Sequence, residues 1–319
     1  MRIRKRKKEG ILKAVPRKLL KAELTPDKLV CATRHSGNLV YDVIYKNAPN
    51  LMQEIGRLRE IAFRDAGGGT GHAVDIDEFD ICANPFHQLL VWSPKEKQII
   101  GSYRYILGKD IKVTDKDVHS PTAKLFDFSD EFIKDYLPYS IELGRSFVQT
   151  QYQASHKGVF ALDNIWDGLG ALLSNHPEIK YFYGKMTMYR NYNKLARDMV
   201  LFFLKKHFPP IQPFMLPRKP LTFFHSETIL SSILTSTDFK EDFKILNREM
   251  STLQCRIPPL VNIYMGLSPT LQCFGTSANI DFGDVEETAI LIKIDDIYES
   301  KKERYIKNYS DHFNNSRLG

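Results

Sequence analysis

Two charged residues, Glu142 and Arg145, carry the clearest chemical potential in this sequence of 319 residues. They lie in SIELGRSFVQT, residues 140–150, whose composition predicts a strand. Residues three apart on a regular strand point to opposite faces, so the two share a face only if the strand bulges, and Gly144 is a plausible bulge site. On a strand that lines a cleft, Glu142 can serve as a general base, directly or through one water. The alternative role is an ion pair with Arg145, and both roles can hold together.

More charged residues gather around a glycine-rich segment, AGGGTG (66–71). A helical pattern that begins at Leu51 runs up to this segment, and Arg59 and Phe63 lie four apart on one face of it, beside an apolar stripe. The glycines end the helix and open a loop that we expect to be flexible and to act as a lid. The stripe consists of Leu51, Ile55, Leu58 and Ala62, and the loop carries Asp75, Asp77, Glu78 and Asp80.

The elements that must position these residues follow from the rest of the pattern. HQLLVWS and QIIGSYRYIL, on either side of the turn-prone PKEK, predict an antiparallel pair of strands. Strands that alternate with helices, antiparallel early in the chain, predict a mixed α/β sandwich. The other predicted elements are strands at 38–46, 140–150, 179–188 and 289–295 and helices at 159–176, 191–208 and about 239–254.

The basic charge of the chain is local. The formal net charge is +7, but residues 1–21 hold ten Lys or Arg and one Glu, which leaves about −2 for the rest. With its interleaved apolar residues, this arm can lie on an anionic membrane surface, where each basic residue is worth about 1 kcal/mol. The alternative is a solvated or partly disordered tail. Because the basicity is confined to the arm, a nucleic-acid partner is not expected.

Hydropathy and cysteine usage narrow the class of protein further. No stretch approaches the ~18 apolar residues of a spanning helix, and the start lacks the apolar region of a signal peptide, so we expect a cytoplasmic protein. The four cysteines are scattered, without metal-ligand spacing, and predict reduced, buried thiols. The nine histidines include no metal-binding pair, so no metal site is expected.

Four short motifs occur in order along the chain: Arg59-x-x-x-Phe63, Asp77-Glu78-Phe79-Asp80, Gly101-Ser102-Tyr103-Arg104 and Glu142-Leu143-Gly144-Arg145. This series resembles the ornithine-lipid and glycine-lipid N-acyltransferases, and more distantly the acyl-homoserine-lactone synthases, all of the GNAT fold. The resemblance covers most of residues 40–295, with weaker echoes at 257–260 and 281–283. It implies a GNAT-like mixed α/β/α sandwich with a C-terminal extension, and transfer of an acyl group, typically 3-hydroxyacyl, from an acyl carrier protein to an amino acid or related amine.

The resemblance also implies how the acceptor is bound. Arg59, Asp77, Asp80 and Arg104 match positions that, in the resembling synthases, build an ion-pair network ordering the pocket of the amine substrate. An amino acid carries a carboxylate that Arg can grip and an ammonium that Asp can attract. The alternative is a structural clamp that pins the acidic loop to the sheet. Phe63 is expected to wall the cleft, with a plain core aromatic as its alternative.

The acyl donor is expected beside the splayed strand. A bulge at Gly144 would part this strand from its neighbour, as the GNAT fold does to admit the pantetheine arm, with Phe147 and Val148 alongside. The loop at 151–158 precedes a helix whose N-terminal amides can hold a phosphate, with Lys157 and Gly158 as contacts. Its single glycine departs from the fold's common coenzyme A loop, which favours a carrier protein as donor, and no tightly bound cofactor is expected.

An acidic carrier protein would dock on basic side chains, for which Lys157, Lys180, Lys185 and Arg190 are candidates, with ordinary surface charge as the alternative.

We divide the chain into a basic arm (1–35), an acyltransferase core (36–207) and a C-terminal extension (208–319). The predicted function is N-acylation of a glycine- or ornithine-type amino acid, giving a lyso-amino-lipid at the inner membrane face, with coenzyme A as the less favoured carrier. Two other functions stay open: a lactone-forming signal synthase that uses S-adenosylmethionine, and a non-catalytic module that binds membrane or nucleic acid.

Overall fold

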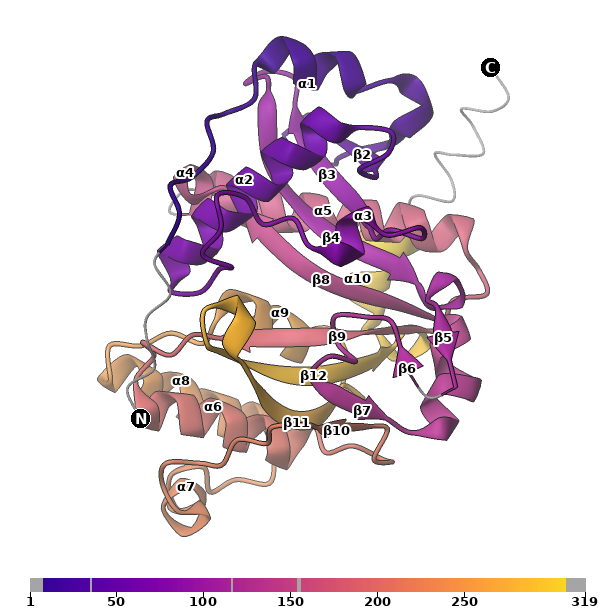
Figure 1. Cartoon of the computed structure of the whole chain (residues 1–319). Helices are drawn as coiled ribbons and strands as arrows, with labels where there is room; N and C mark the ends of the chain where they lie inside the picture. Colours follow the sequence, from indigo (N-terminus) through magenta and orange to yellow (C-terminus); the bar gives the residue numbers. More distant parts are fainter. Residues whose placement is uncertain (1–7, 35, 116, 154–155, 308–319) are drawn as a thin grey trace.

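A mixed β-sheet forms the centre of the molecule (Figure 1). The computed structural model describes residues 8–34, 36–115, 117–153 and 156–307, and of residues 156–162 the backbone alone. In this part of the chain the sheet has eight strands in the order β1-β2-β3-β4-β8-β9-β12-β11; β8 and β9 run parallel, and the other neighbours are antiparallel. The strands are β1 Leu29–Ala32, β2 Leu39–Val43, β3 His87–Ser93, β4 Gln98–Leu107, β8 Ser140–Val148, β9 Tyr181–Met188, β11 Gln272–Asn279 and β12 Val285–Lys293.

Helices cover both faces of this sheet (Figure 1). Neighbouring residues of a strand point to opposite faces, so in β3 Leu90 and Trp92 pack under α2 while Leu89 and Val91 pack under α5. Helices α6, α8 and α9 contribute to the same core as α5. This layering confirms the α/β/α sandwich. The helices are α1 Arg17–Glu23, α2 Pro49–Ala66, α3 Glu78–Ile81, α4 Thr150–Gln153, α5 His156–Asn175, α6 Lys194–His207, α7 Glu227–Ile233, α8 Phe239–Thr252, α9 Pro259–Met265 and α10 Glu299–Lys302.

A long connection between β4 and β8 covers the part of the α2-side face that α2 leaves open. Its Phe126 and Phe132 form a third core with Tyr183 of β9 and Leu291 of β12. Between this core and α2, the sheet face is free for polar side chains. The connection also contributes short strands: β5 Val113–Thr114 pairs with β6 Asp117–Val118, and β7 Phe126–Phe128 pairs with β10 Met215–Pro217.

Residues 8–24 run along α2 and belong to the folded body. The backbone N–H of Val15 donates to the carboxylate of Glu54 at 3.0 Å, and Leu20 of α1 is buried against α2. The carboxylate of Glu23 accepts from the backbone N–H groups of Asn50 and Leu51, which satisfies two unpaired donors at the start of α2. From residue 8 onward the basic segment is therefore docked and is not the free tail of the alternative expectation; residues 1–7 lie outside the described residues.

The glycine-rich segment after α2 is tied down. Helix α2 ends at Gly67, whose φ of 100° only glycine adopts easily. The buried carboxylate of Glu60 accepts from the backbone N–H groups of Thr70 and Gly71 at 2.9 and 2.7 Å. A buried carboxylate that is satisfied by this turn holds it in place, so the expected flexible lid is replaced by a fixed turn.

The predictions for the secondary-structure elements and for the cysteines are confirmed in part. The apolar stripe of α2 is buried throughout, and the predicted strands and helices are present, but β1 and β11 were not anticipated. The four cysteines, all within the described ranges, form no disulfide; Cys31 and Cys273 are buried, whereas Cys82 and Cys255 are only half-buried, which corrects the expectation for that second pair. Within the described ranges, no helix has the length and apolar character needed to cross a membrane.

Candidate active site

Strand β8 bulges at Arg145 and then parts from β9. Ser102 of β4 pairs with Phe147, and Arg104 pairs with Gly144. Two residues of β8 therefore lie opposite one residue of β4 between these pairs, which is a β-bulge. Arg145 is the bulged residue with a left-handed backbone, at a φ of 50°, and it lies one position after Gly144, the bulge site that the sequence suggested. The parallel ladder between β8 and β9 ends at the pair Leu143–Gly184. The predicted bulge and splay are both present.

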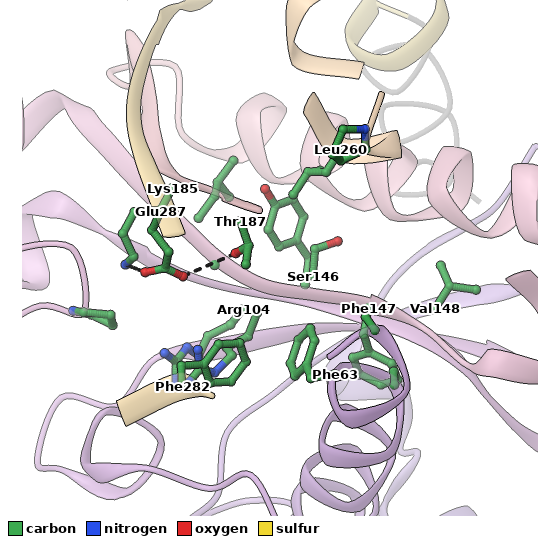
Figure 2. Close-up of a pocket in the computed structure, with 18 of the residues that line it drawn as sticks. Phe63, Arg104, Ser146, Phe147, Val148, Lys185, Thr187, Leu260, Phe282 and Glu287 are labelled. Atoms are coloured by element: carbon green, nitrogen blue, oxygen red, sulfur yellow. Dashed lines mark hydrogen bonds and ion pairs between the residues drawn. The ribbon is translucent and has the colours of Figure 1, made fainter. Parts of the chain in front are cut away.

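A cavity of about 420 Å³ occupies the splay. Figure 2 shows side chains of β8, β9 and α2 converging on it. Its lining is partly apolar and partly polar, the combination expected of a site that holds a fatty chain and a small polar molecule. The apolar lining includes Ala62, Phe63, Phe147, Val148, Leu260 and Phe282, and the polar lining includes Arg104, Glu142, Arg145, Lys185, Thr187 and Glu287.

Glu142 lies on the sheet face that borders the cavity and is only 1% exposed. Its Oε1 accepts hydrogen bonds from the backbone N–H and the hydroxyl of Thr122, at 3.0 and 2.7 Å. Its Oε2 accepts from the hydroxyl of Tyr183 at 2.7 Å. Burial and the neighbouring Glu142 charge raise the pKa of Tyr183 well above its usual value, so the phenol stays protonated and donates. A carboxylate with about four acceptor positions keeps one for a substrate amine.

Arg145 does not pair with Glu142, which corrects the ion-pair alternative. Its Nε lies 3.1 Å from Asp75 and its terminal nitrogen 3.7 Å from Asp77, and its guanidinium stacks 3.8 Å from the ring centre of Phe282. The bulge turns this side chain toward the acidic loop, whereas Glu142 bonds to Thr122. The two residues of the motif therefore border one cavity with separate partners.

The predicted ion-pair network is present, and it has two further members that sequence reasoning did not place in it, Asp75 and Arg145. Arg59 is buried and pairs with Asp80 at 2.8 Å and with Asp75 at 3.2 Å. Arg104 pairs with Asp77 at 2.7 Å and with Asp80 at 3.3 Å. Asp75 joins Arg59 to Arg145, so three arginines face three aspartates. The alternation of Asp residues in the acidic loop was the available signal.

The network charges hold one another ionised. Burial alone would raise the pKa of Asp77, but Arg104, Arg145 and Arg59 together lower it below its usual value. Burial alone would likewise raise the pKa of Asp80, and Arg59 and Arg104 again lower it. Asp77 and Asp80 also close a capping box on α3. The network clamps the acidic loop onto the sheet, and Arg104 and Arg145 are its members that reach the cavity.

The other predicted contacts fall in different places. Phe63 borders the cavity and packs edge-to-face on Phe282, with ring centres 5.0 Å apart. Phe147 and Val148 border it as well, while Arg59, Asp77 and Asp80 stand behind it. The predicted donor contacts Lys157 and Gly158 lie at the start of α5, where side chains fall outside the described residues.

The structure places Lys185 elsewhere than the sequence predicted. It was expected on the surface as a carrier-protein contact, but its side chain is only 11% exposed and borders the cavity. Its Nζ lies 3.2 Å from the hydroxyl of Thr122 and 4.0 Å from Glu287, which in turn accepts from Thr187 (Figure 2). Burial lowers the pKa of Lys185, although Glu287 and Glu142 act to raise it. Sequence reasoning gave no signal for Glu287, because β12 is far along the chain from β8.

No cluster of His, Cys, Asp or Glu suited to a metal occurs among the residues that the structure describes. The polar part of the lining offers instead two carboxylates, a lysine and two arginines. Carboxylates and cations near an apolar wall can move protons and orient a charged acceptor. The arrangement suits acid–base chemistry on an amine beside a bound acyl chain.

Comparison with known proteins defines the class. Residues 58–161, which include the second half of α2 and most of the site, match the acetyltransferase (GNAT) domain. The chain is 52% identical over 305 residues to a glycine N(alpha)-acyltransferase of Bacteroides thetaiotaomicron, covering 94% of this chain and 90% of that protein. It is 51% identical over 308 residues to a glycine N(alpha)-acyltransferase of Phocaeicola vulgatus, covering 94% of each. The protein is therefore an N-acyltransferase with a GNAT domain.

The particular family follows from the same comparison: the chain belongs to the glycine N(alpha)-acyltransferase family. The expectation of a non-catalytic module is thereby set aside. Among solved structures, the AHL synthase LasI is similar with a TM-score of 0.41 and 13% identity, covering 85% of this chain and 95% of that one. That degree of similarity carries no conclusion about this chain.

Proposed function

We propose that this protein acylates the amine of glycine with a fatty acyl group from a thioester, forming N-acylglycine, a single-chain glycine lipid. The supporting observation is the cavity at the β8–β9 splay, whose lining combines apolar side chains with Glu142 and Lys185. Family membership supports glycine as the acceptor, since both relatives are named for it.

The chemistry requires a free amine, because an ammonium has no lone pair with which to attack. Glu142 takes a proton from the glycine nitrogen, directly or through one water, and the nitrogen attacks the thioester carbonyl. The C–N bond forms and the C–S bond breaks, the nitrogen gives its second proton to the departing sulfur, which leaves as the thiol, and Glu142 releases the first proton to water. Backbone N–H groups of β8 beyond Leu143, on the side where the ladder to β9 has ended, stabilise the oxyanion, an effect worth about 2.7–4 kcal/mol per donor in other enzymes.

The proposed donor is an acyl carrier protein, with a 3-hydroxyacyl chain as the preferred cargo. The structure places residues 151–153 in α4 and 156–158 in the first turn of α5, so the predicted loop at 151–158 is largely helical. The composition of this segment supports a carrier protein, because it has a single glycine where coenzyme A loops are glycine-rich. The exposed Lys180 and Arg190 remain candidates to meet the acidic carrier protein. The apolar wall of Phe63, Phe147 and Leu260 offers burial to the acyl chain, at about 0.8 kcal/mol per methylene.

We also propose a cytoplasmic protein that associates with an anionic membrane surface through residues 1–21. Helix α1 buries Leu20 against α2 and leaves Arg17, Lys18 and Lys21 exposed, together with Leu19 at 44% exposure. An exposed basic and apolar strip suits the headgroup region of a bilayer. The product, a lipid with one chain, would leave the enzyme into that bilayer.

A panel of donors and acceptors tests the reaction. The purified full chain is incubated with 3-hydroxyacyl and plain acyl thioesters of carrier protein and of coenzyme A, and with glycine, ornithine, alanine or serine. Amide products are detected by mass spectrometry. We expect N-acylglycine as the main product and the carrier-protein thioester as the better donor. If amide forms with ornithine but not glycine, the proposed acceptor is wrong; if no amide forms with any pair, the proposed reaction is wrong.

A further inference from the structure

Lys185 is the first residue of β9 beyond the splay whose side chain lies on the cavity face of the sheet. The parallel pairing places Glu142 opposite Tyr183, and Lys185 follows Tyr183 by two, so the three side chains share a face. The pairing of β9 with β12 places Glu287 opposite Thr187, on the same face again. The position of Lys185 is thus fixed by strands on both sides and not by a loop.

The ammonium of Lys185 has hydrogen-bonding capacity to spare. Of its three donors, one meets the hydroxyl of Thr122 at 3.2 Å. The carboxylate of Glu287 lies 4.0 Å away, beyond hydrogen-bond range. By contrast, the arginines that border the cavity, Arg104 and Arg145, are each already paired with two aspartates.

Thr122 links this lysine to the proposed base. Its hydroxyl accepts from Lys185 and donates to Glu142, so two hydrogen bonds in series separate the ammonium from the carboxylate. In an α-amino acid a single carbon separates the nitrogen from the carboxylate group. A carboxylate held at Lys185 therefore leaves the amine within the reach of Glu142.

We propose, building on the proposed function, that Lys185 binds the carboxylate of the acceptor and so selects α-amino acids over amines without a carboxylate. Glu287 and Thr122 hold the lysine in position, and Glu142 receives the proton of the amine. An incoming carboxylate supplies the close partner that the buried ammonium lacks. The residue acts in binding and orientation of the acceptor, and not in breaking the thioester.

The test compares glycine with glycinamide, which keeps the amine and lacks the carboxylate. The full chain is assayed with the thioester donor that supports its turnover, and kcat/KM for amide formation is measured for each acceptor. We expect Lys185→Gln to lower kcat/KM for glycine by about 10- to 100-fold, the range for a lost hydrogen bond to a charged group. The value for glycinamide should stay nearly unchanged. Comparing the ratio of the two values between variants cancels the different reactivity of the two amines.

Two further variants control the test. Lys293→Gln removes an exposed lysine at the end of β12, which lies 3.5 Å from Asp296, and should leave both values unchanged. Lys185→Arg keeps the positive charge and should keep the preference for glycine, at a reduced rate; it also serves if thermal unfolding shows that Lys185→Gln does not fold. An unchanged glycine-to-glycinamide ratio in Lys185→Gln, or the loss of that preference in a folded Lys185→Arg, overturns the proposal. Absence of amide product from the unmodified protein would instead refute the proposed function.

Discussion

At the scale of single residues, the charges of the site divide into two groups. The arginine–aspartate network is balanced and mostly closed: Arg59 and Asp80 are buried and make no contact with the cavity. Glu142 and Lys185 make their hydrogen bonds with the neutral side chains of Thr122 and Tyr183, the carboxylate of Glu287 lies 4.0 Å from Lys185, and both residues border the cavity. A charge whose hydrogen-bond partners are neutral keeps its charge available for a substrate.

Replacement of Asp77 tests whether the ion-pair network clamps the acidic loop onto the sheet, through the pH dependence of the free energy of unfolding. Its pKa is lowered in the folded state, so its stabilisation is complete above the unfolded pKa of about 4 and is lost as the pH falls through the folded pKa. We expect Asp77→Asn, which keeps the helix cap, to lower the free energy of unfolding by about 1–3 kcal/mol at pH 7. The difference from the unmodified protein should shrink below about pH 4. Thermal unfolding from pH 7 to 2.5 checks this, and a difference independent of pH would show that the ionised carboxylate contributes nothing.

At the scale of elements, local patterns predicted what lies close in the sequence. The two runs on either side of the PKEK turn gave β3 and β4, and the apolar stripe gave α2, with bounds within two residues, because each element buries one face or both against the core. The bulge was predicted from the spacing of Glu142 and Arg145, although the strained residue is Arg145 and not Gly144. Lys185 and Glu287 could not be assigned to the site, because only the pairing of β9 with β12 brings them together.

Two glycines at the splay give a matched pair of variants. A Cβ on Gly184 would lie 2.4 Å from the carbonyl oxygen of Leu143, whereas a Cβ on Gly144 would meet no atom within 4 Å. We expect Gly184→Ala to destabilise the protein by about 1–3 kcal/mol, as overpacking does. Gly144→Ala should leave the melting temperature unchanged and lower kcat/KM by about 10- to 100-fold, because its methyl group enters the space of the thioester. Full activity of Gly144→Ala with all chain lengths would place the thioester elsewhere.

At the scale of the whole molecule, the site lies where three cores meet. The α2 core supplies Phe63 and Phe147, the core of the long connection supplies Tyr183, and the α5 core supplies Leu143. The described part of the N-terminal segment lies along α2, so its basic residues sit on the outside of the helix that walls the cavity. A membrane met by this surface would lie close to the layer that binds the acyl chain.

Replacement of Arg17, Lys18 and Lys21 of α1 by Gln tests the membrane proposal. At about 1 kcal/mol for each basic residue, binding to vesicles that contain an anionic lipid should fall by up to about 100-fold. The matched control replaces Lys240, Lys244 and Arg248, which are exposed on α8, by Gln. Cosedimentation with anionic and with neutral vesicles measures the effect. Equal binding by the α1 variant and the unmodified protein would rule out this helix as the membrane contact.

The most direct measurement of the central claim is the rate at which Glu142→Gln converts glycine and acyl-carrier-protein thioester to N-acylglycine. The substitution keeps the size of the side chain and removes the base, so we expect kcat to fall by about 10²- to 10⁴-fold. The melting temperature, measured in parallel, shows whether the variant remains folded. A folded variant that forms N-acylglycine at the rate of the unmodified protein would contradict the account, because the proton would then leave the amine by a route that does not involve Glu142.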